Sequence, residues 1–196
     1  MDESSVPASV AWHNRGRGLA SLGRYTAAIR CYNRSLELDP NDAQVWNSKG
    51  FGLNNLGRYA EAIRCYDRAL ELDPGYVIAW CNKGDALANM RRNEEAVSCF
   101  DKACQLDPGC ANAWYHRGLY LGMMRRQKEA IASFSQALNL DPRNTIAWLC
   151  KALAEEVLGQ LPEALRSYQE FLSLASGEFA EEIKLARKRL QKLEAI

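Results

Sequence analysis

The sequence predicts an all-α fold, a solenoid of antiparallel helical hairpins. Tryptophan recurs every 34 residues, a small residue follows each tryptophan four positions later, and a proline closes four of the resulting units. A fixed period of this length is typical of repeat proteins, in which each repeat forms one supersecondary unit. The three columns are Trp12, Trp46, Trp80, Trp114 and Trp148, then Gly16, Gly50, Gly84, Gly118 and Ala152, and finally Pro40, Pro74, Pro108 and Pro142.

Each unit has the pattern of two helices. In the second unit, the apolar periodicity of VWNSKGFGLNNL ends at Gly57. A second periodic stretch runs from Glu61 to Leu72, and Asp73 with Pro74 stops it. We therefore expect a helix, a tight turn and a second helix in every unit.

Small and large residues are placed so that the two helices of a hairpin can pack. Gly50 and Ala62 lack bulk where the helices cross, and Trp46 and Tyr66 fill the space on either side. One hairpin alone leaves an apolar face bare, which only a neighbouring hairpin can cover. Repetition is therefore expected to build the core.

The units define a predicted domain organisation. Residues 1–8 are expected to be a flexible N-terminus, residues 9–178 a single repeat domain, and residues 179–196 a capping helix. The tail carries one apolar helical stripe, and Glu155 interrupts a leucine column in the last unit, as is typical of a terminal repeat. The predicted repeats are 9–42, 43–76, 77–110, 111–144 and 145–178, and the stripe consists of Phe179, Ile183, Ala186, Leu190 and Leu193.

The composition excludes several classes of protein. The 196 residues are 47% apolar and 25% charged, with a net charge of +1, which is typical of a folded chain and not of a disordered or polyionic one. The start, MDESSVPASVAW, is unlike a secretory signal, and no apolar run could span a membrane, so we expect a cytoplasmic location. The seven cysteines form no C-x-x-C pair and are expected to be reduced thiols packed as small apolar groups.

The sequence carries no recognisable catalytic constellation. Its two histidines, His13 and His116, stand three units apart, too far to work together. It lacks a phosphate-binding loop, a zinc-protease motif and a nucleophile elbow. We therefore expect a protein that is not an enzyme, with no cofactor, no metal and no small-molecule substrate.

The order of residues within the unit, namely Trp, Gly, Leu, Tyr, Ala, an aromatic residue, Ala and Pro, resembles the tetratricopeptide repeat. The resemblance implies a right-handed superhelix of helical hairpins. It also implies that the first helix of each hairpin lines a concave groove that binds a peptide or a protein segment.

Matched position by position within the repeat, the resemblance implies that three rows of residues on the first helices face the groove. It also implies a ladder of asparagines along the groove, which adds two positions. The rows are polar toward the N-terminus and apolar toward the C-terminus, which would suit an amphipathic segment. Equally, part of the apolar row could pack between neighbouring first helices or under the capping helix. The rows are His13, Asn47, Cys81, Tyr115 and Leu149; Arg17, Phe51, Asp85, Leu119 and Leu153; and Ser21, Asn55, Asn89, Met123 and Val157; the ladder adds Asn14 and Asn82.

Basic residues form two further patterns. Arginines in the hairpin turns give a basic edge, which is the second choice for a partner contact, although favourable placement at helix C-termini also explains them. A basic column precedes the small-residue column, and we expect its charged heads to point toward the aspartates that end the second helices. The edge is Arg24, Arg58, Arg91, Arg92, Arg125 and Arg126; the column is Arg15, Lys49, Lys83, Arg117 and Lys151; the aspartates are Asp39, Asp73, Asp107 and Asp141.

The function predicted from these observations is that of a non-catalytic adaptor or scaffold that binds a protein or peptide. Self-assembly into a homo-oligomer is one alternative. Nucleic-acid binding by a helical repeat is another, against which the near-zero net charge argues. No membrane partner is expected.

Overall fold

The computed structural model describes residues 6–194. The chain divides into two compact units, Met1–Leu106 and Asp107–Ile196, which are described here one at a time. Over the described residues the regular structure is entirely helical, so the predicted all-α fold is confirmed. Of the predicted flexible N-terminus, residues 1–5 lie outside the described residues, and the first helix already begins at Ala8. The single repeat domain over 9–178 stays a prediction.

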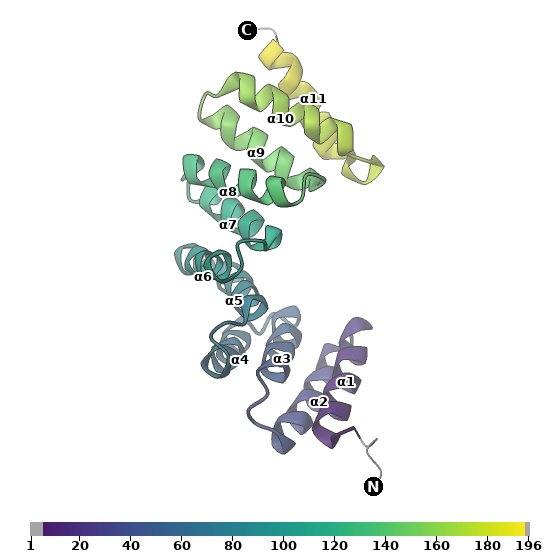
Figure 1. The fold of residues 1–196 in the computed structure, drawn as a ribbon. Helices are drawn as coiled ribbons and strands as arrows, with labels where there is room; N and C mark the ends of the chain where they lie inside the picture. Colours follow the sequence, from purple (N-terminus) through teal and green to yellow (C-terminus); the bar gives the residue numbers. More distant parts are fainter. Residues whose placement is uncertain (1–5, 195–196) are drawn as a thin grey trace. The chain divides into compact units, whose positions relative to one another are not determined.

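The first unit consists of three helical hairpins (Figure 1). Within each hairpin the two helices pack on each other, and the second helices of the first two hairpins also pack on the first helix of the hairpin that follows. The hairpins are α1 (Ala8–Ser21) with α2 (Tyr25–Leu38), α3 (Ala43–Asn55) with α4 (Tyr59–Leu72), and α5 (Val77–Asn89) with α6 (Asn93–Leu106).

The second unit consists of two hairpins and a C-terminal helix that packs on the last of them. Phe171 and Tyr168 on α10 are fully buried, and Ala186 and Leu193 on α11 complete their apolar cluster. This contact confirms the predicted capping helix. The elements are α7 (Ala111–Met123), α8 (Gln127–Leu140), α9 (Thr145–Val157), α10 (Leu161–Leu174), the 3-10 turn Gly177–Phe179 and α11 (Ala180–Glu194).

The predicted packing of small against aromatic residues is confirmed. A Cβ atom added to Gly50 would lie 2.6 Å from Cε1 of Tyr66, which is far closer than two carbon atoms approach without repulsion. Ala62 and Tyr66 are both fully buried. The glycine therefore allows α3 and α4 to approach until the tyrosine ring lies against the backbone.

The tryptophans are half-buried, and four of the five hydrogen-bond to the turn that precedes their own helix. The indole N–H of Trp46 donates to the carbonyl of Pro40 at 2.9 Å, and that of Trp80 donates to Pro74 at 3.0 Å. Trp114 and Trp148 repeat the bond in the second unit. These four tryptophans thus hold their first helices to the turns that precede them.

The expected direction of the basic column is wrong. The Nζ atom of Lys49 lies over the ring of Trp46, 5.0 Å from its centroid, and the other four members of the column lie over their own tryptophans in the same way. Asp73 instead accepts a hydrogen bond from the backbone N–H of Gly75 at 3.0 Å. The cations follow the tryptophan because residues three apart share a helix face, which makes a cation–π contact available locally.

The turn inside each hairpin needs one residue with a positive φ. Gly57 takes this conformation with φ of 73°, where a glycine meets no steric penalty. Arg91 and Arg125 adopt φ of 60° in the third and fourth hairpins although they carry a Cβ. The break expected at Gly57 therefore occurs at the corresponding arginines as well.

Five of the seven cysteines are buried, which confirms their role as small packing residues. Burial raises the pKa of the Cys99 thiol to about 11, because an ionised thiolate is poorly solvated there. Within residues 6–194, no helix has the length and apolar character needed to cross a membrane.

Candidate functional site

The first of the three predicted groove rows is largely buried. His13, Asn47, Cys81 and Leu149 expose only 8, 7, 7 and 6% of their surfaces, and Tyr115 is half-buried. Packing therefore covers most of these four side chains, and among them only Asn47 lines one of the two pockets described below. Their role in binding a partner stays a prediction. Leu149 belongs to the apolar cluster beneath α11, which is the alternative that the sequence left open.

Polar members of the buried row connect consecutive first helices. Asn82 on α5 donates its Nδ2–H to Oδ1 of Asn47 on α3 at 2.9 Å, and Nε2 of His13 on α1 lies 3.0 Å from Oγ of Ser48 on α3. Both pairs join residues 35 apart, so one relation recurs between successive hairpins. One donor of Asn82, expected to hold a peptide backbone, is thus used within the protein.

His13 also has an altered protonation equilibrium. Burial lowers its pKa because the charged imidazolium is poorly solvated there. The negative charge of Asp42 opposes this shift, and the positive charge of Arg17 adds to it.

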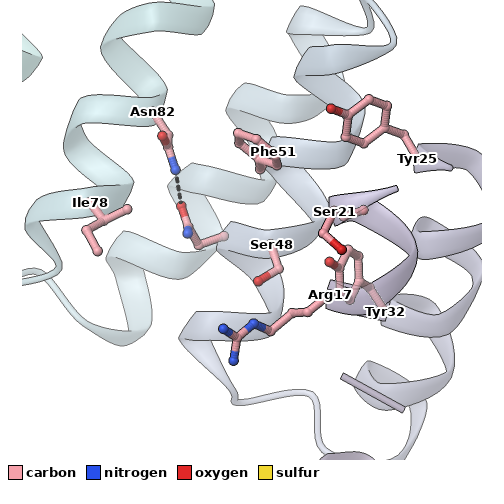
Figure 2. A pocket seen from close by; sticks show the side chains of 10 residues that line it. Arg17, Ser21, Tyr25, Tyr32, Ser48, Phe51, Ile78 and Asn82 are labelled. Carbon is pink, nitrogen blue, oxygen red and sulfur yellow. Dashed lines mark hydrogen bonds between the residues drawn. The ribbon is translucent and has the colours of Figure 1, made fainter. Parts of the chain in front are cut away.

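Several predicted residues from all three rows and the ladder gather around one pocket of the first unit, with a volume of about 560 Å³. Figure 2 shows Ile78 and Asn82 of α5 on one side of Ser48, and Arg17 and Ser21 of α1 on the other. We call it the first-unit pocket. It is lined by Arg17, Ala20, Ser21, Tyr25, Tyr32, Asn47, Ser48, Phe51, Ile78 and Asn82.

The first-unit pocket combines exposed apolar surface with hydrogen-bonding groups. Phe51 is 43% exposed, and its ring centroid lies 6.2 Å from that of Tyr25 at an interplanar angle of 71°. Ile78 is 58% exposed. Arg17, also exposed, contributes a guanidinium with five N–H donors. The surface can therefore meet an apolar side chain and a backbone carbonyl or carboxylate at the same time.

Four more predicted residues gather around a smaller, mainly apolar pocket of the second unit, of about 280 Å³. Met123 and Val157 at this pocket are 63% and 71% exposed, which is unusual for large apolar side chains. We call it the second-unit pocket. It is lined by Leu119, Gly122, Met123, Gln127, Phe134, Cys150, Leu153, Ala154 and Val157.

Some residues predicted to bind a partner line neither pocket. Conversely, some residues that line a pocket were not predicted from the sequence. Asn55 bonds the carbonyl of its own helix at Phe51, 2.9 Å away. The most prominent missed residues are Tyr25 and Ile78, which lie at helix starts outside the three rows. Ile78 carried a signal, since it stands four residues before Asn82 and thus on the same helix face. Predicted residues outside both pockets are His13, Asn14, Asn55, Cys81, Asp85, Asn89, Tyr115 and Leu149.

Half of the predicted basic edge is neutralised within the protein. Arg58 donates two hydrogen bonds, each 2.7 Å long, to the carboxylate of Glu61. Arg92 and Arg126 make the same two-point pair with Glu95 and Glu129. Hydrogen bonding to these arginines lowers the pKa of all three glutamates. These pairs were not predicted from the sequence, although the spacing of three residues is one at which helical side chains meet.

Arg24 is the exception among the arginines that directly precede the second helices. No carboxylate of residues 6–194 lies within ion-pair distance of its guanidinium, because Ala27 stands where the other hairpins carry the glutamate.

Comparison with family models supports the repeat assignment. Two models of the tetratricopeptide repeat match the chain, one at residues 9–42, 43–76 and 77–110, and the other at residues 111–144. These limits coincide with the first four predicted repeats. The fifth, 145–178, is matched by neither model but forms the α9–α10 hairpin. A comparison with curated proteins found no match.

Solved structures with similar folds include three that cover most of this chain. MamA from Desulfovibrio magneticus RS-1 is 20% identical, with a TM-score of 0.78, covering 87% of this chain and 97% of its own. TTC0263, a thermophilic TPR protein in Thermus thermophilus, is 24% identical with a TM-score of 0.69, covering 96% and 100%. YrrB, described as a TPR protein with an unusual peptide-binding site, is 19% identical with a TM-score of 0.73, covering 90% and 91%. At these identities the likeness establishes the fold.

Proposed function

The chain belongs to the tetratricopeptide-repeat family, and from this membership we propose that it is a non-catalytic adaptor or scaffold that binds a peptide or protein segment. The observation that carries the proposal is the first-unit pocket. Its lining residues come from three consecutive hairpins, so a bound segment would contact α1, α3 and α5 together. The resemblance of the fold to YrrB, whose description names a peptide-binding site, is consistent with a ligand of this class.

The chemistry of the first-unit pocket suits a short peptide. Phe51 and Tyr25 give a rigid aromatic wall, and such side chains dominate the energetics of many protein interfaces. Arg17 can donate to carbonyl or carboxylate oxygens of the ligand. Ile78 adds an exposed aliphatic surface on the opposite side. A peptide with an apolar side chain next to an exposed carbonyl or carboxylate would satisfy all three features.

The pair formed by His13 and Ser48 has the spacing of a base and a nucleophile, so it needs separate consideration. In a catalytic triad a carboxylate orients the histidine through its other ring nitrogen. No carboxylate of residues 6–194 accepts a hydrogen bond from Nδ1 of His13, and the carboxylate of Asp42 instead caps α3 by accepting from Gln44 and Val45. The pair is better explained as a link between α1 and α3.

A peptide-display selection against the immobilised protein tests the proposal. Selected peptides would be titrated, by fluorescence anisotropy, with the wild-type protein and with the variants Arg17→Ala and Phe51→Ala. Truncation of an aromatic residue that anchors an interface costs more than about 1 kcal/mol, so we expect the dissociation constant to rise at least about fivefold for Phe51→Ala.

Leu56→Ala is the matched control, because Leu56 is exposed to a similar degree (40%) but does not line the pocket. Its affinity should equal that of the wild type. Failure to select any peptide, or equal affinities for Phe51→Ala and Leu56→Ala, would contradict the proposal. Light scattering of the free protein at increasing concentration would detect the alternative, self-assembly.

A further inference from the structure

Four arginines converge on a hollow of about 530 Å³ along the first hairpin. Arg15 comes from α1, Arg24 from the turn, and Arg30 and Arg34 from α2. The hollow shares no lining residue with the first-unit pocket. We call it the arginine hollow. Its other lining residues are Trp12, Leu19, Ala27 and Cys31.

The second hairpin has cations at the positions equivalent to Arg15, Arg24 and Arg30. There they act on one carboxylate, that of Glu61. Lys49, Arg58 and Arg64 follow Arg15, Arg24 and Arg30 by 34 residues. The hydrogen bonds from Arg58 are the main reason why the pKa of Glu61 lies below its ordinary value. The charges of all three cations lower it further.

The same arrangement recurs in the next two hairpins. In each, a glutamate accepts two hydrogen bonds from the arginine that directly precedes the second helix, and its pKa is lowered by that arginine and by a cation of the first helix. A glutamate paired with this arginine therefore recurs in three successive hairpins, and in the third hairpin Lys83 also pairs with Asp67 at 2.7 Å. The later groups are Glu95 with Arg92 and Lys83, and Glu129 with Arg126 and Arg117.

The first hairpin keeps the cations and lacks the carboxylate. Ala27 occupies the position of Glu61. Among residues 6–194, no carboxylate lies within ion-pair distance of Arg15, Arg24 or Arg30, whereas Arg34 pairs with the exposed Glu37 at one end of the hollow. The arginine hollow thus has the arginines that pair with a glutamate in the second hairpin, but Ala27 stands in place of that glutamate.

We propose that the arginine hollow binds an acidic segment of a partner protein, one of whose Asp or Glu carboxylates takes the place that Glu61 has in the second hairpin. This site lies beyond the pocket of the proposed function. From Arg24 to Arg34 the helix α2 rises about 15 Å, the length of roughly four to five residues of extended peptide. Carboxylates pair favourably with arginine because the guanidinium presents parallel N–H donors.

The same observations favour an acidic peptide over a nucleic acid. Single-stranded nucleic acids bind where cations alternate with exposed aromatic faces on which bases stack. Here the ring of Trp12 is covered by the guanidinium of Arg15, 5.3 Å from its centroid. The next hairpin carries Glu61 and Glu71 in ion pairs, so a long polyanion would meet negative charges beyond the hollow.

Substitution of Ala27 by glutamate tests the proposal sharply. The Ala27→Glu variant should restore the internal ion pair with Arg24 in a geometry that three other hairpins already accept, so it should fold normally. Fluorescein-labelled hexaglutamate at low ionic strength is the probe, and anisotropy gives the affinity. We expect hexaglutamate to bind the wild-type protein and to bind Ala27→Glu about fivefold to tenfold more weakly, because each exposed ion pair contributes modestly.

Two further variants and a second probe complete the experiment. Arg58→Gln removes an edge arginine that Glu61 already neutralises, so hexaglutamate should bind it as it binds the wild type. Glu61→Ala should create a second hollow and raise the amount of probe bound at saturation. Circular dichroism confirms that each variant is folded. Absence of hexaglutamate binding, equal affinity for wild type and Ala27→Glu, or tighter binding of an oligothymidylate of equal charge would each overturn the proposal.

Discussion

At the scale of single residues, the central ring of each hairpin can be a tyrosine or a phenylalanine, and the difference has a measurable consequence. Tyr66 is fully buried, and its hydroxyl has no hydrogen-bond partner among residues 6–194. Tyr168, at the same position of the last hairpin, donates its hydroxyl to Glu156 at 2.7 Å. Burial raises the pKa of both phenols. The two rings fill the same space, but only one hydroxyl is satisfied.

The substitutions Tyr66→Phe and Tyr168→Phe should therefore have different effects. Removing an unsatisfied buried hydroxyl should leave stability unchanged or raise it by up to about 1 kcal/mol. Removing the Tyr168 hydroxyl should cost roughly 1–3 kcal/mol, because a charged acceptor loses its donor. Thermal unfolding followed by circular dichroism measures both, and a larger loss for Tyr66→Phe would contradict this interpretation.

The burial of His13 predicts a pH effect on stability. The pKa of His13 is lowered in the folded protein, chiefly by burial, so the unfolded chain takes up a proton more readily. Stability should fall as the pH drops below the ordinary value of 6.5 and toward the lowered folded value.

The His13→Asn variant isolates this effect, since asparagine is the residue that the second hairpin uses in the same place. The fall in melting temperature between pH 7.5 and pH 5.5 should be smaller in the variant than in the wild type. An equal fall in both proteins would show that His13 does not cause it.

At the scale of secondary-structure elements, the hairpin turns differ in how well their residues fit a positive φ. Gly57 at 73° is unstrained, whereas Arg91 at 60° carries a Cβ in the left-handed region. Arg91→Gly should therefore raise stability by about 0.5–1 kcal/mol, after allowance for the greater freedom of glycine in the unfolded chain. Gly57→Ala should lower it by a similar amount. Chemical denaturation of the two variants checks both signs, and a loss for Arg91→Gly would refute the argument.

The capping helix α11 offers a second prediction about an element. Ala186 is fully buried in the cluster that includes Phe171 of α10. In the Ala186→Asp variant a charge would replace an apolar contact, so α11 should detach more readily and subtilisin should cleave it sooner. Arg187→Asp changes an exposed neighbour and serves as the control. Equal cleavage rates for the two variants would mean that this contact does not hold α11 in place.

At the scale of the whole molecule, the 34-residue period was enough to predict every hairpin, and the apolar stripe of the tail predicted the capping helix, because spacing and residue size fix helix faces locally. The 34-residue period does not determine the distance between neighbouring first helices. The burial of His13 therefore could not be predicted, and neither could the inclusion of Ile78 in a pocket, whereas the burial of Leu149 was one of two open alternatives. The pairing of Arg58 with Glu61 could have been found from their spacing of three residues.

Departures from the repeat, more than the repeat itself, distinguish one surface of this chain from another. Ala27 breaks a column of glutamates and leaves the arginine hollow without a carboxylate. Phe51 stands where the other hairpins carry Arg17, Asp85, Leu119 and Leu153, and it gives the first-unit pocket an exposed aromatic ring. The common columns build the hairpins, and the exceptions give individual hairpins their chemistry.

An NMR titration of the labelled protein with a display-selected peptide tests the central claim most directly, because it shows where the ligand lies. The account predicts that the largest chemical-shift changes fall on Arg17, Phe51 and Asn82, which line the first-unit pocket. Chemical-shift changes confined to the exposed residues of α4 and α6, or the absence of any change at saturating peptide, would contradict it.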